Sequence, residues 1–402
     1  MICNRRTFFT AAAGVALGTR MAAATAQGAN NRIRIGVIGT GGRARGLMGL
    51  LKKLPGNEMV ALCDVYEPRV LQAAEIAGAA ATKVADYRRI LDDRGIDAVV
   101  IGAPDHWHKT IALDAVAAGK DVYVEKPVSH TLEEGAEMVK AIEGSKQIVQ
   151  TGTQQRSWDH FVLGKQIIDS GRLGQITFVQ TYWYQHATAG AYAPVSMDKL
   201  DWKRWLGPAR DQPFKPERFY QWRHFWDFGG GQVTDLMTHW IDVVHWYMNV
   251  DAPLSAAATG HNYNIKLWEA PDTVNVTLEF PKDFMAVYLG TYVSKVDDGG
   301  LEFRGERGTL KIDRARLAFY RDDAAYAQGT LTPEPDILVR SSGDGTLTHM
   351  QNWLDCIRSR KQPNAHIRVG HQAARTSHLA NAALRSGRPV RWNGAAEKIE
   401  TV

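Results

Sequence analysis

Short apolar runs alternate with helical patterns through the first part of the chain. The runs are rich in Val and Ile, and most of them end at a polar or glycine-rich turn. They occupy residues 32–38, 59–63, 97–103, 121–124 and 147–151. Apolar runs of this kind, separated by helical segments, are typical of parallel strands that are buried on both faces. The pattern predicts an α/β domain over residues 31–155.

Beyond about residue 155 the pattern changes to longer alternating runs. These runs occupy residues 175–184, 254–264, 273–280 and 285–294. Alternation joined by short turns indicates a largely antiparallel sheet with one covered face. We therefore expect an α+β domain with a large, mostly antiparallel open β-sheet over residues 156–345. Helical patterns at 347–358 and 371–386 predict that segment 346–402 forms helices that pack back on the first domain.

The first 26 residues differ from the rest of the chain. Arg5 and Arg6 precede a short apolar run, and Ala24-Thr25-Ala26 has the small-x-small form of a cleavage site. This arrangement predicts a twin-arginine signal peptide over residues 1–26 and a periplasmic location for the mature protein. An ordinary secretory signal or a membrane anchor fits less well, because the apolar run is short for a membrane span.

Composition excludes several classes of function. The formal net charge is +5, of which the first 26 residues supply three arginines and no acid. A mature chain so close to neutral gives no reason to expect a nucleic-acid partner. Cys63 lies in a predicted strand and Cys356 in a predicted helix, so neither a disulfide framework nor a zinc site is expected. No segment beyond residue 26 is long and apolar enough for stable membrane insertion.

A glycine-rich turn follows the first predicted strand at once. The turn consists of Gly39, Thr40, Gly41, Gly42 and Arg43. Glycines at these positions permit a tight turn and let backbone N–H groups approach a pyrophosphate at a helix N-terminus. Asp64 ends the second strand, where an acid binds ribose hydroxyls and repels a 2′-phosphate. The motif predicts an NAD-binding Rossmann domain, although Asp64 serving only as a helix cap is an alternative interpretation.

Polar side chains also follow three later strands, at the edge where open α/β sheets bind ligands. Lys126, after Glu125, is the candidate acid, base or hydrogen-bond donor, although surface lysines at strand ends are common. The two histidines that follow the third strand have no third metal ligand nearby in sequence, so no metal site is predicted there. We expect these residues to form a wall against the nicotinamide instead. The third strand is followed by Pro104, Asp105, His106, Trp107 and His108, and the fifth by Gln154 and Arg156.

The segment from Gly229 opens a helix in the second domain that carries Asp235 and His239. Because these residues are four positions apart, a helix places them on one face. A carboxylate one turn away can hold a histidine in a set orientation, and the histidine can then take a proton near neutral pH. Two other interpretations remain open: a buried core histidine, and a metal face completed by Asp242 and His245.

Aromatic residues are concentrated around this helix. Seven of the twelve tryptophans lie between residues 183 and 246, interleaved with tyrosines and charged groups. Flat rings beside charges suit the alternating CH and OH faces of a sugar, although some of them must simply pack the domain. The residues expected to contact a small carbohydrate substrate are Arg156, Tyr182, Trp202, Arg223, Asp235 and His239.

Together, the glycine turn, Asp64, Glu125-Lys126-Pro127 and the Asp235 and His239 pair resemble the Gfo/Idh/MocA superfamily of glucose-fructose oxidoreductase and inositol dehydrogenase. The resemblance covers nearly the whole mature chain. It implies a Rossmann domain, an open-sheet domain and an active site between them. It also implies that Lys126 hydrogen-bonds the reacting hydroxyl beside the nicotinamide, that Asp235 has an orienting role in the site, and that His239 acts as acid or base. Implied cofactor contacts are Gly42, Arg43, Asp105, His106, Trp107, His108, Glu125 and Gln154.

These observations leave three hypotheses of function. The leading one is an NAD-dependent sugar or glycoside dehydrogenase, and the family also leads us to expect a homodimer or homotetramer. The second is a glycoside hydrolase that oxidises C3 transiently, as in the NAD-dependent α-N-acetylgalactosaminidases, with Tyr182, His186 or His224 as a second base. Asp235 before His239 departs from that branch. The third is a non-catalytic sugar-binding protein, against which the intact set of Lys126, Asp235 and His239 counts.

Overall fold

The first sheet of the computed structural model is six-stranded and parallel. The structure describes residues 32–190, 192–322 and 334–402, so the predicted signal peptide lies outside the described residues. The sheet has the order β3-β2-β1-β4-β5-β6. Its strands are β1 (Ile33–Ile38), β2 (Asn57–Cys63), β3 (Thr82–Val84), β4 (Ala98–Ile101), β5 (Asp121–Val124) and β6 (Val149–Thr151). The order reverses between β1 and β4, and this reversal opens a ligand crevice beyond the carboxyl ends of these strands.

Helices cover this sheet as the alternating pattern predicts. They are α1 (Gly42–Leu51), α2 (Glu67–Ala77), α3 (Arg88–Leu91), α4 (His108–Ala117) and α5 (Leu132–Glu143). The Thr131 side chain caps α5 by accepting a hydrogen bond from the Glu134 N–H at 3.2 Å, and Glu134 in turn accepts from the His130 N–H at 3.0 Å. Helix α10 (Gly345–Ser359) packs on the same core through Met350, Trp353 and Leu354. The C-terminal segment therefore does return to the first domain at α10.

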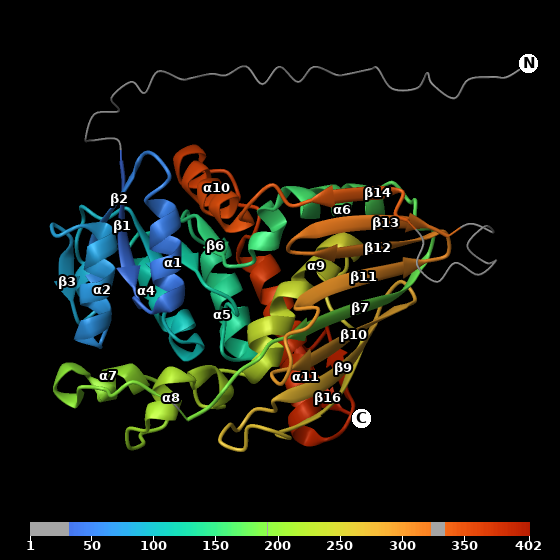
Figure 1. Ribbon diagram of the computed structural model, residues 1–402. Coiled ribbons are helices and arrows are strands. Elements are labelled where there is room, and N and C mark those ends of the chain that lie inside the picture. Colours follow the sequence, from blue (N-terminus) through green and yellow to red (C-terminus); the bar gives the residue numbers. More distant parts are fainter. Residues whose placement is uncertain (1–31, 191, 323–333) are drawn as a thin grey trace, which may run out of the picture. The chain divides into compact units, whose positions relative to one another are not determined.

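The second sheet has ten strands in the order β14-β13-β12-β11-β7-β10-β9-β8-β15-β16. Its pairs are antiparallel except for β7 with β10, which are parallel. Figure 1 shows these strands side by side. They are β7 (Ile176–Tyr184), β8 (Ser255–His261), β9 (Thr273–Phe280), β10 (Phe284–Thr291), β11 (Gly299–Gly305), β12 (Gly308–Asp313), β13 (Arg316–Arg321), β14 (Ile337–Arg340), β15 (Val390–Asn393) and β16 (Lys398–Thr401).

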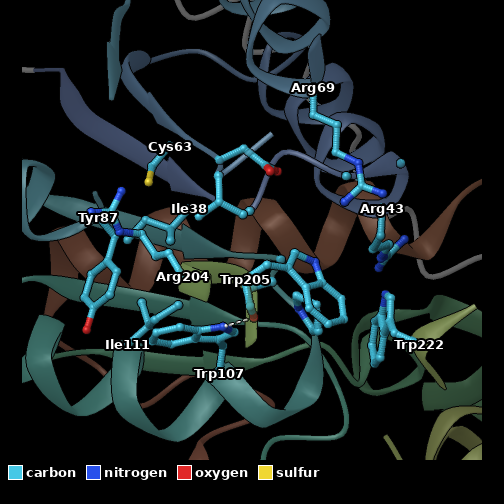
Figure 2. Close-up of a pocket in the computed structure, with 18 of the residues that line it drawn as sticks. Ile38, Arg43, Cys63, Arg69, Tyr87, Trp107, Ile111, Arg204, Trp205 and Trp222 are labelled. Carbon is cyan, nitrogen blue, oxygen red and sulfur yellow. Dashed lines mark hydrogen bonds between the residues drawn. The ribbon is translucent and has the colours of Figure 1, made fainter. Parts of the chain in front are cut away.

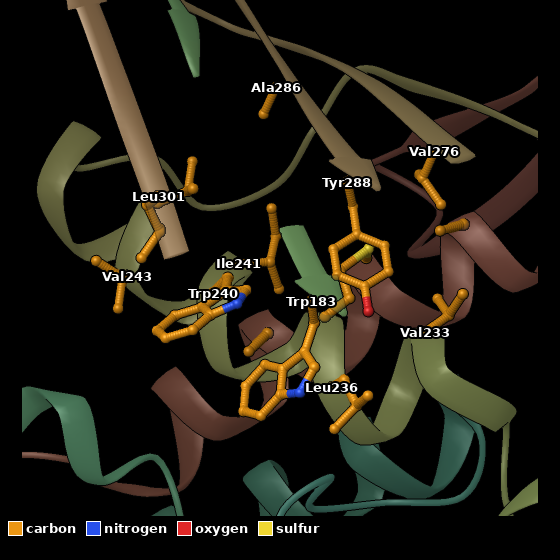
Figure 3. Close-up of a cluster of buried hydrophobic side chains, with 14 of the residues drawn as sticks. Trp183, Val233, Leu236, Trp240, Ile241, Val243, Val276, Ala286, Tyr288 and Leu301 are labelled. Carbon is orange, nitrogen blue, oxygen red and sulfur yellow. The ribbon is translucent and has the colours of Figure 1, made fainter. Parts of the chain in front are cut away.

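Helices cover one face of the large sheet. They are α6 (Asp159–Asp169), α9 (Thr238–Met248) and α11 (Ile367–Ser386). Trp240 of α9 is fully buried and packs against Trp183 of β7 with the two rings tilted and their centroids 5.3 Å apart. Figure 3 shows these two rings among Val243, Tyr288 and Leu301. Burying this apolar face fixes α9, and with it the site residues that precede and begin the helix.

The end of the chain departs from the expected all-helical C-terminal segment. After α11 the chain forms β15 and β16, which pair with each other and extend the large sheet beside β8. Alternation in these short strands is too brief to be distinguished from a turn in sequence.

Within the described residues, no helix is long and apolar enough to cross a membrane. Among the same described residues, no group of three or more His, Cys, Asp or Glu side chains is placed to hold a metal ion.

Candidate active site

The glycine turn between β1 and α1 has the geometry of a phosphate cradle. Gly39 has φ +79°, and a Cβ there would lie 2.5 Å from the Ala103 backbone nitrogen. Gly41 and Gly42 face open space, since no atom lies within 4 Å of a Cβ built at either position. No side chain caps the start of α1, so its first N–H groups are left for an anion. The described residues therefore fit a dinucleotide pyrophosphate.

Asp64 binds the turn to the end of β2. Its Oδ2 accepts a hydrogen bond from the Thr40 N–H at 2.8 Å, and its Oδ1 accepts one from the Tyr66 N–H at 3.0 Å. Asp64 also lines a cavity of about 260 Å³, which Figure 2 shows and which is the first of two cavities that adjoin at this edge of the sheet. Asp64 thus has a structural role, and it also lies on the wall where a ribose is expected.

The second wall of this first cavity comes from a segment that precedes the helix bearing Asp235. Helix α7 (Trp202–Leu206) and helix α8 (Pro216–Tyr220) belong to this segment. Trp107 donates a hydrogen bond from Nε1 to the Trp205 carbonyl at 2.9 Å, and this contact is visible in Figure 2. The cavity is lined from this segment by Arg204, Trp205, Tyr220, Trp222 and Arg223. A cofactor in the cleft would therefore contact both domains.

A second cavity, of about 450 Å³, holds the predicted catalytic residues. It shares Arg43, Gly102, Ala103, Trp222 and Arg223 with the first cavity, so the two adjoin. The predicted residues that line it are Arg43, Asp105, His108, Glu125, Lys126, Gln154, Arg223, Asp235 and His239. Strand ends of the first sheet and the helical segment of the second domain thus meet at one cavity.

Lys126 and Asp235 form a partly buried ion pair across the two domains. The Lys126 Nζ donates to Asp235 Oδ1 and to the Asp235 carbonyl, both at 2.5 Å. Arg223 Nε also donates to Oδ1, at 3.1 Å. Burial raises the pKa of Asp235, but the charges of Lys126 and Arg223 outweigh it and hold this pKa well below its ordinary value. Asp235 is therefore ionised and fixes the Lys126 amine in the cavity.

His239 is buried at the start of α9 and lines the same cavity. Its ring stacks on Trp183, with centroids 5.7 Å apart and an interplanar angle of 28°. Burial, followed by the charges of Lys126, Arg314 and Arg43, lowers the pKa of His239 well below 6.5. The imidazole is therefore neutral near pH 7 and can accept a proton.

Asp235 does not orient His239 by a hydrogen bond, in contrast to the expectation from their spacing. No described group hydrogen-bonds the buried His239 Nδ1, and the Asp235 carboxylate pairs with Lys126 and Arg223 instead. The reason is local: Val233–Met237 form a π-helical turn immediately before α9. A wider i→i+5 turn changes the four-residue register that an α-helix would give.

The remaining cofactor candidates divide into cavity walls and supports. Asp105 lines the second cavity, and burial raises the pKa of its carboxyl well above the ordinary value, against the charges of Arg223 and Lys126. His108 bridges two strand ends through the carbonyls of Pro127 and Ala103, at 2.7 and 2.9 Å. His106 contacts the Trp205 carbonyl at 3.2 Å and lines neither cavity. Pro104 and Trp107 line the first cavity, and Thr40 lines neither.

Three predicted substrate contacts lie outside the cavities. Arg156 points to Asp242, with Nε 2.9 Å from each carboxylate oxygen. Trp202 packs on Trp205 and donates Nε1 to the Gln212 carbonyl at 2.8 Å. Tyr182 lies against Tyr184 rather than the cavity. Its neighbour Trp183 is in the wall instead, because successive side chains of a strand point to opposite faces.

Several cavity residues were not predicted from the sequence. They are Trp183, Gln185, Ala187, Gln221, Trp222, Leu236, Trp268, Tyr292 and Arg314, while His224 was named only as a candidate second base. His224 stacks on Trp268 with ring centroids 3.6 Å apart. Trp268 and Arg314 are far from the motifs in sequence, and only the pairing of the large sheet brings them to the site. For Trp183, the sequence signal was its position in the alternating strand, which decides the face of the sheet on which the side chain lies.

Comparison with known proteins assigns this architecture to a family. Residues 33–153 match a model described as the oxidoreductase family, NAD-binding Rossmann fold, of the GFO/IDH/MocA group. Residues 161–311 match the GFO/IDH/MocA C-terminal domain. The chain belongs to the GFO/IDH/MocA oxidoreductase family. It is therefore an NAD-binding oxidoreductase, and the glycine cradle, Asp64 and the two adjoining cavities are the parts of this member that fit the cofactor.

Individual relatives are more distant. Inositol 2-dehydrogenase of Salmonella typhimurium is 25% identical over 309 residues, which cover 74% of this chain and 78% of the relative. A glycosyl hydrolase family 109 protein of Solibacter usitatus is 33% identical over 127 residues, or 29% of each chain. A solved levoglucosan dehydrogenase in complex with NADH and levoglucosan has a TM-score of 0.70 at 20% identity, covering 90% of this chain and 99% of that one. This last likeness shows a shared fold.

Proposed function

We propose that this family member is a sugar or glycoside dehydrogenase. The observation that carries the proposal is the meeting of Lys126, from a strand end of the NAD-binding domain, with Asp235 and His239, from the second domain, in one cavity that adjoins the cofactor cleft. NAD supplies a hydride acceptor when bound. The relatives named for inositol and levoglucosan act on polyhydroxylated rings, and this supports the same substrate class here.

The two catalytic side chains divide the proton chemistry between them. Lys126 donates a hydrogen bond to the oxygen of the reacting hydroxyl, and Asp235 keeps its amine in place. His239 is neutral and accepts the hydroxyl proton as hydride leaves the same carbon. His239 is buried and Trp183 stacks beside it, and together these features limit the access of water to the transferred proton.

Turnover by protein loaded with NAD tests the proposal. Nicotinamide absorbance is followed while free sugars, inositols and aryl glycosides are offered in turn. We expect net reduction with at least one polyhydroxylated ring, and a loss of about 10²- to 10⁴-fold in kcat for both Lys126→Ala and His239→Ala. Lys109→Ala is the control, because this partly exposed lysine pairs with Glu137 at the surface. Unchanged turnover in both active-site variants would contradict the assignment.

A hydrolytic outcome is the second candidate. The match to the family 109 glycosyl hydrolase covers 29% of the chain. Of the three residues considered as a second base, only His224 lines the second cavity, and burial lowers its pKa to about 3, so it is neutral. Release of aglycone from aryl glycosides without net NADH would favour hydrolysis, and His224→Ala would then abolish release while leaving hydride exchange.

We propose that residues 1–26 direct export by the twin-arginine pathway to the periplasm. The paired Arg5 and Arg6 before an apolar run and Ala24-Thr25-Ala26 support this. Replacing both arginines by lysine should retain the protein in the cytoplasm, as fractionation would show. Export that continues unchanged in this variant would overturn the proposal.

We also propose that the protein is a homodimer or homotetramer. The large sheet exposes apolar side chains such as Met285 of β10 and Leu338 of β14. Light scattering of the purified protein measures its mass, and a monomer at all accessible concentrations would contradict the proposal.

A further inference from the structure

Arg314 is placed in the active-site cavity by the turn between β12 and β13. It lines the second cavity together with His239 and Trp183. Its guanidinium lies over the Trp183 ring, 4.6 Å from the centroid, and 5.8 Å from that of Trp240. Two of its nitrogens, Nε and Nη2, are buried and have no hydrogen-bond partner among the described residues. The side chain is thus held by aromatic packing while its hydrogen-bond donors remain unsatisfied.

The other cations of this cavity each have a carboxylate partner within the protein. Arg43 pairs with Glu125 at 2.7 Å, and both Lys126 and Arg223 pair with Asp235, at 2.5 and 3.1 Å. Within residues 32–190, 192–322 and 334–402, Arg314 has no carboxylate at ion-pair distance. Among the described residues, it is therefore the cavity arginine that has no carboxylate partner.

A buried guanidinium without a partner is costly, because burial removes the water that would hydrate it. Its flat array of donors matches the two oxygens of a carboxylate, and such pairs are stronger than neutral hydrogen bonds. The stack on Trp183 fixes the plane of the guanidinium. The site therefore has the chemistry of an anion receptor beside the catalytic base.

We propose that Arg314 binds a carboxylate on the substrate, so that the enzyme acts on a sugar acid, a uronic acid or its glycoside. This inference rests on the proposed dehydrogenase function and specifies its substrate class. A cofactor phosphate is the other source of an anion. Arg314 does not line the first cavity, where the glycine turn and the start of α1 lie, and we therefore assign it to the substrate.

The test compares acids with their neutral esters on protein loaded with NAD. Probes are D-glucuronate and D-galacturonate, each against its methyl ester, with binding followed by calorimetry and turnover by nicotinamide absorbance. We expect an acid to be preferred over its ester by about 10- to 100-fold in affinity. Arg314→Gln should remove this preference, and Arg314→Lys should restore part of it. The matched control is Arg316→Gln, which removes an exposed charge two residues further along.

Each remaining outcome decides the inference. Equal binding of acids and esters by the unaltered enzyme, with neutral sugars oxidised, overturns the carboxylate site and leaves the dehydrogenase standing. A weaker affinity for NAD in Arg314→Gln, with the acid preference retained, assigns the arginine to the cofactor. Binding of the acids through Arg314 without any reduction of NAD supports the anion site and contradicts the dehydrogenase. An equal loss for acids and esters in Arg314→Gln means a structural role.

Discussion

Single residues at this site have roles set by burial and by neighbouring charge. Asp235 is the clearest case, because its spacing from His239 suggested a carboxylate that orients a histidine. The carboxylate instead pairs with Lys126 and Arg223, and His239 keeps an unpaired Nδ1. Deleting the Asp235 charge would therefore act first on the placement of Lys126, and only then on proton transfer.

The pH dependence of oxidation follows from His239. Burial and three nearby cations lower its pKa well below 6.5, and the base is active only when neutral. Activity is therefore retained as pH falls from neutrality and is lost only below that depressed pKa. We expect kcat/KM for sugar oxidation to lack an acid limb near the ordinary histidine value of about 6.5. An acid limb centred there, and absent in His239→Ala, would contradict the assigned electrostatics.

Substitution by alanine should have opposite effects on stability at Gly39 and at Gly46. Gly39→Ala forces a side chain into positive φ and against the Ala103 backbone, so it should destabilise the fold by more than about 1 kcal/mol and weaken NAD binding. Gly46 is exposed within α1 and its Cβ would meet nothing. Gly46→Ala should stabilise by about 0.5–1 kcal/mol through helix propensity. Thermal unfolding and NADH fluorescence titration measure both effects.

At the scale of elements, the segment that contains α7 and α8 connects the two domains over the cofactor cleft. The Trp205 carbonyl accepts a hydrogen bond from Trp107 Nε1 and contacts His106, and Trp205 lines the first cavity. Export as proposed would leave the enzyme without a supply of free NAD, and a covering segment of this kind favours retention of the cofactor through many turnovers.

Removal of the Trp205 ring tests this retention. Trp205→Ala should increase the dissociation rate of NADH by about 10-fold or more, because it opens the cavity wall and removes buried aromatic packing. Stopped-flow fluorescence with a competing nucleotide gives the rate. Trp202→Ala is the matched control, since Trp202 stacks on Trp205 at 4.6 Å but lines neither cavity. Equal acceleration in both variants would mean general loosening of the segment.

For the molecule as a whole, buried neutral histidines make stability depend on pH. His349 of α10 contacts the Thr151 carbonyl through Nε2 at 2.9 Å and the Ser157 hydroxyl through Nδ1 at 2.7 Å. Burial lowers its pKa to about 4. The unfolded chain, with a histidine pKa of about 6.5, then binds more protons between these values, and stability falls as pH decreases through this window.

Replacement of His349 by glutamine tests this linkage. The contribution of one such histidine is at most about 3 kcal/mol between pH 6.5 and 4. We expect His349→Gln to be less stable at neutral pH and to lose less stability on acidification than the unaltered protein. Denaturant unfolding at a series of pH values measures the slope. Parallel curves for the two proteins would exclude His349 as a source of the acid sensitivity.

The sequence by itself determined the first domain and the glycine cradle with Asp64, and it singled out Lys126, Asp235 and His239, which line one cavity of the structure. These features are local, because strand, turn and helix follow from periodicity and glycine placement within a few residues. It also predicted the character of the second sheet. The parallel β7 and β10 pair and the strands at the C-terminus depend on long-range pairing, and no short window of sequence specifies that pairing.

The tertiary structure decided which side chains reach the cavity. The alternation of side chains along β7 places Trp183 in the cavity wall and leaves Tyr182 outside it. Arg156 pairs with Asp242 instead of lining the cavity. A π-helical turn redirected Asp235 from His239 to Lys126. Arg314 reaches the site only because the large sheet brings the β12–β13 turn beside α9 and β7. Charge balance among groups so distant in sequence is a property of the packed molecule, because it depends on which partners burial leaves within hydrogen-bond reach.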